Sequence, residues 1–590
     1  AVAITSTVTG IGNYATLSPI DQVQGASTLS NGNLTITGNG NHSSTRSTFQ
    51  TDGSGKFAWE VTVTNQDTNV VIGLMRSSDQ TSGTDVIGNQ TNSGWALIKG
   101  GDTSSRYNNS DMVADIGASA TNGDVYHLEL DNSTGDVFAW RKPSGGTFAA
   151  LNSGNTITAG AGKTALAGTP VLFAQHVYQN TGATNPNVLT YNFGQTTFEQ
   201  TPSSSYKAVN TANLAEPTVT DPSAYFQTKT YTGNGGTNTL TFDGNSDMQP
   251  DFIWIKCRNN SRGHVVVDSV RGGASYIHSD ANSAQTTADP NNLVTAFGSD
   301  GFTLGDISNA NANTETFVAW GLKAGGAPTA DNSGDASPTN NSIMIDGAAS
   351  TTTLTTSNIY PKRASGSNTS KFGIIRYTGN GSSSTQTLAN PFSWSPDVIF
   401  CKNLEAGDDW EIFHSSLGHS GNSRMYLNKS DAASGASRIN AVSANQITFV
   451  ASTSGCNPSS QDVMMYAWAK TSCAIAVGQY TGNGSADGPY VIVDDGGSGF
   501  KPAFFMSKRV ADSGYNWQIT DAARDPENPL GYNASANLDG TDGDGSGTYM
   551  DFTSNGVKIR TSSPQWNADG KIYIYLAFAE AAFASNSRAR

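Results

Sequence analysis

Short runs in which apolar and polar residues alternate occur along the whole chain. Residues 57–63 read Phe-Ala-Trp-Glu-Val-Thr-Val, and residues 126–130 and 137–140 follow the same pattern. A period of two is typical of half-buried β-strands. The Asn-, Ser-, Gly- and Asp-rich residues 131–136 favour the tight turn of a hairpin between the last two runs. Because no amphipathic helical pattern exceeds about two turns, we predict an all-β chain of tandem antiparallel β-sandwiches.

The motif Tyr-Thr-Gly-Asn-Gly occurs three times and opens three similar stretches of sequence. The copies lie at residues 231–235, 377–381 and 480–484. Each is followed by an apolar strand that starts at Pro and ends at Lys, then by a turn between two apolar positions, and finally by an aromatic strand. A repeat of this length indicates related structural units. We therefore predict three related β modules, each marked by the motif as a tight turn.

Changes in composition divide the chain into a head domain followed by these modules. At 590 residues it is too long for one hydrophobic core. Almost no linker separates the last two modules, so we expect them to share an interface. The predicted parts are a jelly-roll or lectin-like head domain (1–200), a Pro-, Ser- and Thr-rich linker (201–223), module one (224–325), a linker with a short strand (326–369), module two (370–470) and module three (473–590).

Charge and hydropathy exclude several classes of function. Charged residues make up 14% of the chain, and the net charge is −15. A nucleic-acid-binding face would need a basic stripe, which the scattered Lys and Arg residues do not form. No run approaches the roughly 20 apolar residues that cross a bilayer, and the first residues lack the charged-then-apolar pattern of a signal peptide. We therefore expect neither nucleic-acid binding nor membrane insertion.

Four cysteines are too few for a disulfide framework. Cys456 and Cys473 are the one pair that we consider for a disulfide bond. Cys401 falls at an apolar strand position of module two, so we expect it to fill the core.

Catalytic signatures are missing from the sequence. No Gly-x-Ser-x-Gly elbow lies between a strand and a helix, and no His-Glu-x-x-His motif is present. A glycan-cleaving enzyme needs two carboxylates beside the scissile bond. The clearest place where acidic residues gather near an aromatic ring is Trp410, which Asp408, Asp409 and Glu411 flank. A solvated loop before a strand explains that cluster more simply. We predict that the chain is not an enzyme and keep Trp410 as a candidate binding residue.

Calcium is the one candidate cofactor. Asp539, Asp542 and Asp544 place three carboxylates on one Gly-rich loop, and carboxylate oxygens are the ligands that calcium prefers. The loop lacks the final bidentate Glu of an EF-hand. An ordinary Asp- and Gly-rich turn therefore remains the alternative.

Two sets of repeated residues could bind ligands. Lys256, Lys402 and Lys508 recur at one strand position, where they could hold an acidic glycan or a neighbouring subunit, although an exposed strand face is the simpler interpretation. The sequence alignment also places three aromatic residues at one position of the closing strands. We expect them to fill the core rather than to form a carbohydrate platform. They are Trp320, Trp468 and Phe578.

The head domain resembles a known fold family. Four segments look like the ordered landmarks of a SPRY-like, concanavalin-type jelly-roll domain, and the last, which contains Asn-Phe-Gly-Gln, is the most specific. They are residues 29–35, 55–61, 71–74 and 191–198. Similar domains occur in fibre proteins of bacteriophages, so the resemblance implies recognition and not catalysis.

The three modules resemble an uncharacterised β module of virion proteins from marine phages, including cyanophages. Module one matches best, through its motif and the strands at 250–256, 264–271 and 317–323. Modules two and three depart at the arginine-bearing strand, where they have Trp410 and Trp517. This resemblance implies a setting for the protein and no chemistry.

Together these features predict a virion component that acts by binding. It would be a structural or receptor-binding protein of a phage, in a tail fibre or a capsid-attached fibre. It would assemble in the host cytoplasm and be extracellular on released particles. The expected partners are a host-surface glycan or protein, other virion proteins and further copies of the chain, since several modules raise avidity. The alternatives are a secreted bacterial adhesin or filament subunit and, less favoured, a polysaccharide depolymerase.

Overall fold

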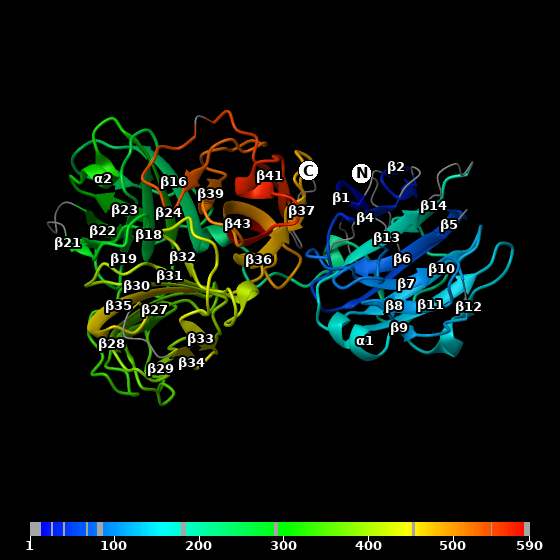
Figure 1. The fold of residues 1–590 in the computed structure, drawn as a ribbon, viewed down its shortest axis with the longest axis horizontal. Helices are drawn as coiled ribbons and strands as arrows, with labels where there is room; N and C mark the ends of the chain where they lie inside the picture. The colour runs from blue at the N-terminus through cyan, green and yellow to red at the C-terminus, as the bar shows by residue number, and fades with distance from the viewer. Residues whose placement is uncertain are drawn as a thin grey trace.

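The computed structural model describes residues 13–582 except 25–26, 39–41, 67–68, 80–85, 118, 179–184, 288–292, 451–454 and 544. It is built almost entirely of β-strands in antiparallel sheets, which confirms the predicted fold class. The chain forms two lobes (Figure 1), a head lobe coloured blue to cyan and a module lobe coloured green to red. In the described part, the α-helices are short: α1 (Gly160–Leu166), α2 (Ser308–Asn311) and α3 (Pro564–Asn567). None of these helices has the length and apolar character needed to cross a membrane.

The head lobe is a sandwich of two sheets. Its core lies between them, where the rings of Trp59 and Phe173 meet edge to face with centroids 4.8 Å apart. The predicted hairpin forms, with Leu130 opposite Val137. The first sheet has the order β1 (Leu17–Gln24), β4 (Ser43–Ser47), β13 (Leu172–Tyr178), β6 (Asn69–Met75), β7 (Trp95–Lys99), β8 (Ser105–Tyr107) and β9 (Ser110–Val113). The second has the order β12 (Ala149–Ala150), β11 (Asp136–Lys142), β10 (Val125–Asp131), β5 (Lys56–Asn65), β14 (Val188–Asn192), β3 (Thr35–Thr37) and β2 (Thr28–Ser30).

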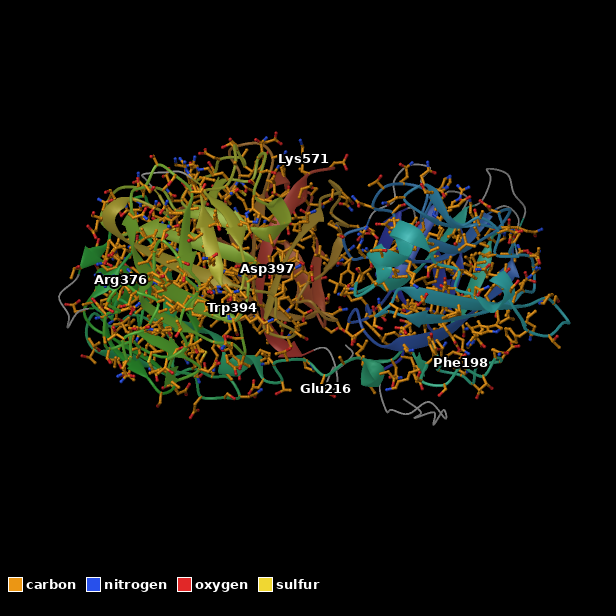
Figure 2. The ribbon with its side chains drawn as sticks, turned by 90° about the horizontal axis from the view of Figure 1, so that it is seen from below. Phe198, Glu216, Arg376, Trp394, Asp397 and Lys571 are labelled. Carbon is orange, nitrogen blue, oxygen red and sulfur yellow. The ribbon has the colours of Figure 1, made fainter. Side chains whose placement is uncertain are left out.

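The segment after residue 200 belongs in part to the head lobe. The amide of Ser203 donates to Glu129 on the outer face of β10. Strand β15 (Lys207–Ala208) pairs in parallel with β5, and Leu214 packs into the head core. The residues that follow carry the chain from the head lobe to the module lobe, and Figure 2 shows Glu216 on this connection. The predicted linker at 201–223 is therefore packed on the sandwich over its first half.

Each of the three repeats contributes one large sheet and one three-stranded sheet. Module one contains β16 (Phe226–Thr232), β24 (Thr316–Leu322), β18 (Phe252–Cys257) and β19 (Val265–Asp268), and its small sheet contains β17 (Asn238–Leu240), β23 (Gly301–Leu304) and β22 (Val294–Gly298). Module three contains β36 (Ile475–Thr481), β43 (Ile572–Ala582), β38 (Phe500–Arg509), β39 (Gln518–Asp521) and β40 (Ala534–Ser535), and its small sheet contains β37 (Tyr490–Ile492), β42 (Gly556–Ile559) and β41 (Met550–Thr553).

Module two has additional strands at one edge. Its large sheet has the order β26 (Ala348–Ala349), β25 (Ile343–Ile345), β27 (Pro361–Gly366), β28 (Phe372–Asn380), β35 (Ser459–Trp468), β30 (Val398–Asn403), β31 (Glu411–His414) and β32 (Met425–Tyr426), and its small sheet contains β29 (Gln386–Ala389), β34 (Gln446–Phe449) and β33 (Ile439–Val442). The first three of these strands lie between residues 326 and 369. That interval is therefore part of the module two sheet and not a linker, because its strands complete the ladder beside β28.

The remaining short elements lie at turns and connections. They are β20 (Ser275–Tyr276), which pairs with β21 (Thr286–Thr287), and the 3-10 helices η1 (Asn152–Gly154), η2 (Thr211–Asn213), η3 (Pro222–Ala224) and η4 (Ser415–Leu417).

The large sheets of the three modules pack around one shared core. Apolar side chains from all three surround a central void of about 10 Å³. The lining residues are Phe252, Trp254, Trp320 and Leu322 of module one, Phe400 and Trp468 of module two, and Phe504, Met506, Leu576 and Phe578 of module three. The modules thus form a compact ring and not a string, because the inner faces of the three large sheets pack against one another in one core.

The shared core confirms the buried role of the closing aromatics and corrects their alignment. Trp320, Trp468 and Phe578 are at most 4% exposed. Strand pairing places Trp468 opposite Val398 but Trp320 opposite Trp254, so the position equivalent to Trp468 in module one is Leu322. The sequence alignment was shifted by two residues. Such a shift keeps a side chain on the same face of a strand.

The repeated motif closes each module through one set of contacts. The Tyr231 hydroxyl donates to the Ala310 carbonyl at 2.6 Å, and Asn234 exchanges hydrogen bonds with buried Asn311. A Cβ at Gly233 would lie 2.2 Å from the Ala312 carbonyl oxygen, and Gly235 has a φ of 65°. The equivalent contacts in the other modules join Tyr377 to Cys456, Asn380 to Asn457, Tyr480 to Trp566 and Asn483 to Asn567. In each module the motif begins in a strand, at the end of β16, β28 or β36, and leads into the turn that follows, so its residues are fixed by local packing.

Candidate functional site

The strand that differs between modules carries a repeated contact across each module boundary. Trp410 Nε1 of module two donates to the His278 carbonyl of module one at 2.8 Å, and Trp517 Nε1 of module three donates to Tyr426 of module two at 2.8 Å. Trp410 is 1% exposed. Trp410 is therefore neither an accessible binding residue nor part of a solvated loop, the two interpretations of the sequence, because a neighbouring module covers the ring.

His264 makes the equivalent contact in module one. Its Nδ1 accepts a hydrogen bond from Trp254 Nε1 at 2.8 Å, so the proton lies on Nε2, which is 3.1 Å from the Ser535 carbonyl of module three. Burial holds the pKa of His264 well below its usual range, so the ring is neutral. Each module thus donates one indole or imidazole N–H to the module before it. Because module one donates to module three, these contacts run around the whole circle of modules.

The three repeated lysines are buried at these boundaries. Lys256 Nζ donates to the carbonyls of Cys257 and Asp539 at 2.8 and 3.1 Å, and Lys508 Nζ donates to Asp431 at 3.0 Å. Lys402 makes the same kind of contact within module two, to Asn403 and Ala406. All three have 0% exposure. The sequence predicted either an exposed strand face or binding of an acidic glycan. Both predictions are wrong, because the lysines are buried.

Burial also changes the acidity of these lysines. It lowers the pKa of Lys402 and of Lys508 to about 8, because the charged ammonium loses solvation. The pKa of Lys256 is also lowered by burial, but the nearby Cys257 thiol and the carboxylates of Asp542, Asp280 and Asp539 oppose the shift. The strand pattern could identify the shared position, but not the module that covers it.

The proposed calcium loop joins module three to module one. The Asp542 carboxylate lies between two guanidinium groups, 2.9 Å from Arg258 and 3.0 Å from Arg524. The Asp539 carbonyl accepts from the Arg262 amide at 3.0 Å, while the Asp539 side chain is exposed. Asp544 lies outside the described residues. Across the described part of the chain, no group of three His, Cys, Asp or Glu residues could hold a metal ion. Asp542 is thus an ion-pair partner at a module boundary.

Two buried ion pairs at the boundaries were not predicted from the sequence. Arg271 lies 2.6 Å from Asp268, which also accepts from the Tyr466 hydroxyl of module two at 2.7 Å. Arg524 lies 2.6 Å from Asp521, which accepts from Trp320 Nε1 of module one at 3.1 Å. The repeated spacing Asp-x-x-Arg, at 268–271 and 521–524, is the signal that could have identified them.

The four cysteines are free and buried. Cys456 and Cys473, the one pair considered for a disulfide bond, do not form one, since Cys456 packs in the core of module two and Cys473 in that of module three. Cys401 fills the module two core, as predicted.

Module three also holds the head lobe. Leu172 of β13 packs against Tyr490 and Ile492 on the outer face of β37. Lys558 Nζ donates to the Ile20 carbonyl at 2.9 Å, and Asn555 Nδ2 donates to the Thr48 carbonyl at 3.2 Å. Gln50 adds a further hydrogen bond, to the Gly497 carbonyl at 2.8 Å. The lobes are therefore joined by side-chain contacts as well as by the chain.

A cleft with a volume of about 510 Å³ lies along this junction. One wall comes from the start of the head sandwich and the other from the small sheet of module three. The lining residues are Asn13, Tyr14, Thr16, Ser18, Pro19, Ile20, Thr48, Phe49, Thr211, Tyr490, Thr553, Ser554 and Asn555. None of these described lining residues is charged. Concave sites with a few placed polar groups are the usual form of a small-molecule binding site.

Hydrogen bonds hold the walls of the cleft in position. The Tyr490 hydroxyl bonds to the Asn555 side chain, and Thr553 Oγ1 lies 3.4 Å from the same hydroxyl. Burial raises the pKa of Tyr490, so its phenol stays neutral. In the head-side wall, the Thr16 amide donates to Thr48 Oγ1 at 3.2 Å. The site is thus a neutral, preformed pocket with hydroxyl and amide groups on both sides, and it is the candidate functional site of the chain.

This cleft was not predicted from the sequence. Its two walls are separated by more than 400 residues along the chain, as between Ile20 and Tyr490. The one available signal was that the modules differ in sequence at the arginine-bearing strand and at a hairpin of the small sheet. That difference does not say what these strands contact.

Two solved structures are similar to part of the chain. The SPRY domain of human HERC1 is 16% identical over 31% of this chain and 99% of that chain, with a TM-score of 0.22. Peanut lectin, solved with a nine-residue peptide, is 12% identical over 28% of this chain and 88% of that chain, with a TM-score of 0.20. The assignment of the head lobe as a sandwich rests on its own two sheets.

Comparison with curated protein sequences gives no match. A family profile described as a domain of unknown function, DUF7483, matches residues 221–347 and 343–582. These segments cover all three repeats, which is more than half of the 590 residues. The chain therefore belongs to the DUF7483 family.

Proposed function

We propose that this chain is a structural or receptor-binding component of a phage virion, in a tail fibre or a capsid-attached fibre, and that it acts by binding. The observation that carries the proposal is the preformed cleft between the head lobe and module three. A cleft of this size suits a small ligand or the tip of a larger one. Its partners would be a host-surface glycan or protein together with other virion proteins.

The build of the module lobe supports a role in a durable particle. Three repeats share one apolar core, and their boundaries are joined by buried ion pairs and ring N–H donors. The low content of charged residues makes the surface less sensitive to salt. The resemblance of the modules to virion proteins of marine phages supplies the proposed setting, and copies of the chain in one fibre would add avidity.

Antibody labelling of particles tests this proposal. An antibody raised against the head lobe is applied to intact marine phage particles that carry this chain and viewed by electron microscopy. We expect label on a fibre at the tail or the capsid surface. Label on bacterial cells in uninfected cultures, and none on particles, would replace the proposal with a secreted adhesin.

Binding is tested separately with the purified, fluorescently labelled full chain and a panel of marine bacterial strains. We expect saturable attachment to the strains that the phage infects. Release of oligosaccharides from host polysaccharide during the incubation would contradict a purely binding role and favour a depolymerase.

A further inference from the structure

We propose that the inter-lobe cleft binds an uncharged saccharide. This inference rests on the proposed function, because it names the class of ligand that the candidate recognition site would take. It differs from the expectation based on the sequence, in which repeated lysines would hold an acidic glycan, since those lysines are buried inside the module lobe.

The chemistry of the lining matches a polyhydroxylated ring. A sugar presents hydroxyl groups at its edge, which need donors and acceptors, and C–H groups on its faces, which pack on aromatic rings. Three aromatic residues line the cleft, Tyr14 and Phe49 on the head side and Tyr490 on the module side. Phe49 and Tyr490 are 3% and 6% exposed, so the half-buried Tyr14 is the ring most open to the face of a sugar. Around them lie the amides and hydroxyls of the remaining lining residues. Both requirements are met within one pocket.

Some of the polar groups in the cleft are available to a ligand. No hydrogen bond joins the hydroxyl of Tyr14 or Ser554, both half-buried, to another residue of the described structure. Tyr14 is half-buried, so its ring is partly open to solvent. By contrast, the Tyr490 hydroxyl is already bonded to Asn555 and so holds a fixed orientation. The cleft thus combines fixed groups, which define its shape, with free hydroxyls, which can bond to a ligand.

The charges nearest to the cleft are neutralised by partners. Lys558 is bonded to the Ile20 carbonyl and pairs with Asp487 at 2.7 Å, and Arg46 is buried against Asp21 at 2.8 Å. A sulfate, phosphate or uronate group would therefore find no free cation among the described lining residues. The net charge of −15 also opposes the approach of a polyanion. An uncharged ligand is favoured by both the local and the overall electrostatics.

Module three forms this site because it differs from its repeats. Strand pairing places Thr239 of module one and Thr387 of module two at the position of Tyr490. Neither residue can supply the ring that packs beside Leu172 and lines the cleft. The matched threonine in module one is exposed, so it offers a control position on the same kind of sheet.

The test uses the purified full chain and a panel of immobilised oligosaccharides. The neutral probes are oligomers of glucose, galactose, mannose and N-acetylglucosamine, and the acidic probes are uronic-acid and sulfated oligomers of the same length. We expect binding to at least one neutral probe and none to its acidic counterparts. Tyr14→Ala, which removes a ring, should weaken binding about tenfold, because a stacked, hydrogen-bonded contact is worth about one such factor.

A second variant guards against loss of folding. Tyr490→Phe keeps the ring that packs on Leu172 but removes the hydroxyl that orients Asn555, and it should weaken binding severalfold with an unchanged thermal transition. Thr239→Val, at the equivalent position of module one, should bind like the wild type. Equal binding by wild type, Tyr14→Ala and Tyr490→Phe would overturn the inference, as would a preference for acidic probes or the absence of binding to every neutral probe.

The outcomes also separate this inference from the proposed function. If the labelled chain attaches to host cells and neutral sugars neither bind to it nor compete, the saccharide inference fails and a binding role stands. If it binds neutral probes but particles carry no label, the saccharide inference stands and the virion setting fails. If it binds neither cells nor probes, both are overturned.

Discussion

Modules one and three share one strand register, yet their small sheets meet different surroundings. In module one, Thr239 and Thr303 face each other with hydroxyls 3.2 Å apart, and Thr239 is exposed. In module three the paired positions are Tyr490 and Lys558, and the head lobe covers them. The residues that the copies share build the common core and the turn of the motif. The residues that differ create the docking surface and the cleft.

The largest expected loss of stability concerns the buried ion pairs at the module boundaries. Module one has one such pair, Asp268 with Arg271, and module three has the other, Asp521 with Arg524. Asp268→Asn would leave the guanidinium of Arg271 buried without its carboxylate, and we expect a loss of about 3 to 5 kcal/mol in the free energy of unfolding. Asp521→Asn should lower the free energy of unfolding by less, because Arg524 keeps a second ion pair, with the Asp542 carboxylate 3.0 Å away. Denaturant unfolding of the full chain, followed by tryptophan fluorescence, measures both. An equal loss, or a loss below about 1 kcal/mol at Asp268, would contradict this account.

The second prediction concerns the motif, which should behave alike in the two modules. A Cβ at Gly233 or at Gly482 would lie 2.2 or 2.3 Å from a backbone carbonyl oxygen. Gly233→Ala and Gly482→Ala should each destabilise the protein by about 3 kcal/mol, because backbone must move to relieve the overlap. Gly236→Ala is the matched control, since only a side-chain atom 3.9 Å away would meet its Cβ. Different costs for the two motif variants would show that the copies do not share one role.

These predictions also show what the sequence could and could not reveal. The alternation of residues and the repeat are local, so the all-β class and the motif turn were accessible. Burial of Lys256 and Trp410 depends on a neighbouring module, and a strand pattern does not say what covers a face. The cleft between Ile20 and Tyr490 depends on docking of distant segments. Local patterns therefore predicted the elements, while the candidate site required their assembly.

The third prediction compares the lysines of the two modules through pH. The pKa of Lys508 is about 8 in the folded state, against about 10.5 in the unfolded chain. Between these values the unfolded chain binds more protons, so stability should rise with pH, by at most about 1.4 kcal/mol per unit for one lysine. Between pH 8 and 9.5, Lys508→Met should make the slope of stability against pH less positive than in the wild type. The comparison isolates the lysine, because the buried thiols, which also titrate in the unfolded chain in this range, are the same in both proteins.

Lys256→Met should change the same slope less, because nearby carboxylates and a thiol oppose the effect of burial on Lys256. The measurement is the denaturant midpoint of each variant at several pH values. A slope that neither variant alters, or one that Lys256→Met alters more than Lys508→Met, would contradict the assigned shifts.

The smallest expected effect is at the exposed threonine pair of module one. Thr239→Val removes one hydroxyl from a solvent-facing sheet and should change the free energy of unfolding by less than about 0.5 kcal/mol. It should also leave the lobes docked. A large loss of stability would mean that this face is covered in the folded protein, as its counterpart in module three is.

Small-angle X-ray scattering of one variant tests the central claim most directly, namely that the residues peculiar to module three hold the head lobe and form the cleft. Tyr490→Thr, Ile492→Thr and Lys558→Thr are combined to give module three the small, polar surface of module one. The account predicts a larger radius of gyration and maximum dimension, with the thermal transition of the module lobe retained. A scattering curve identical to that of the wild type would contradict it.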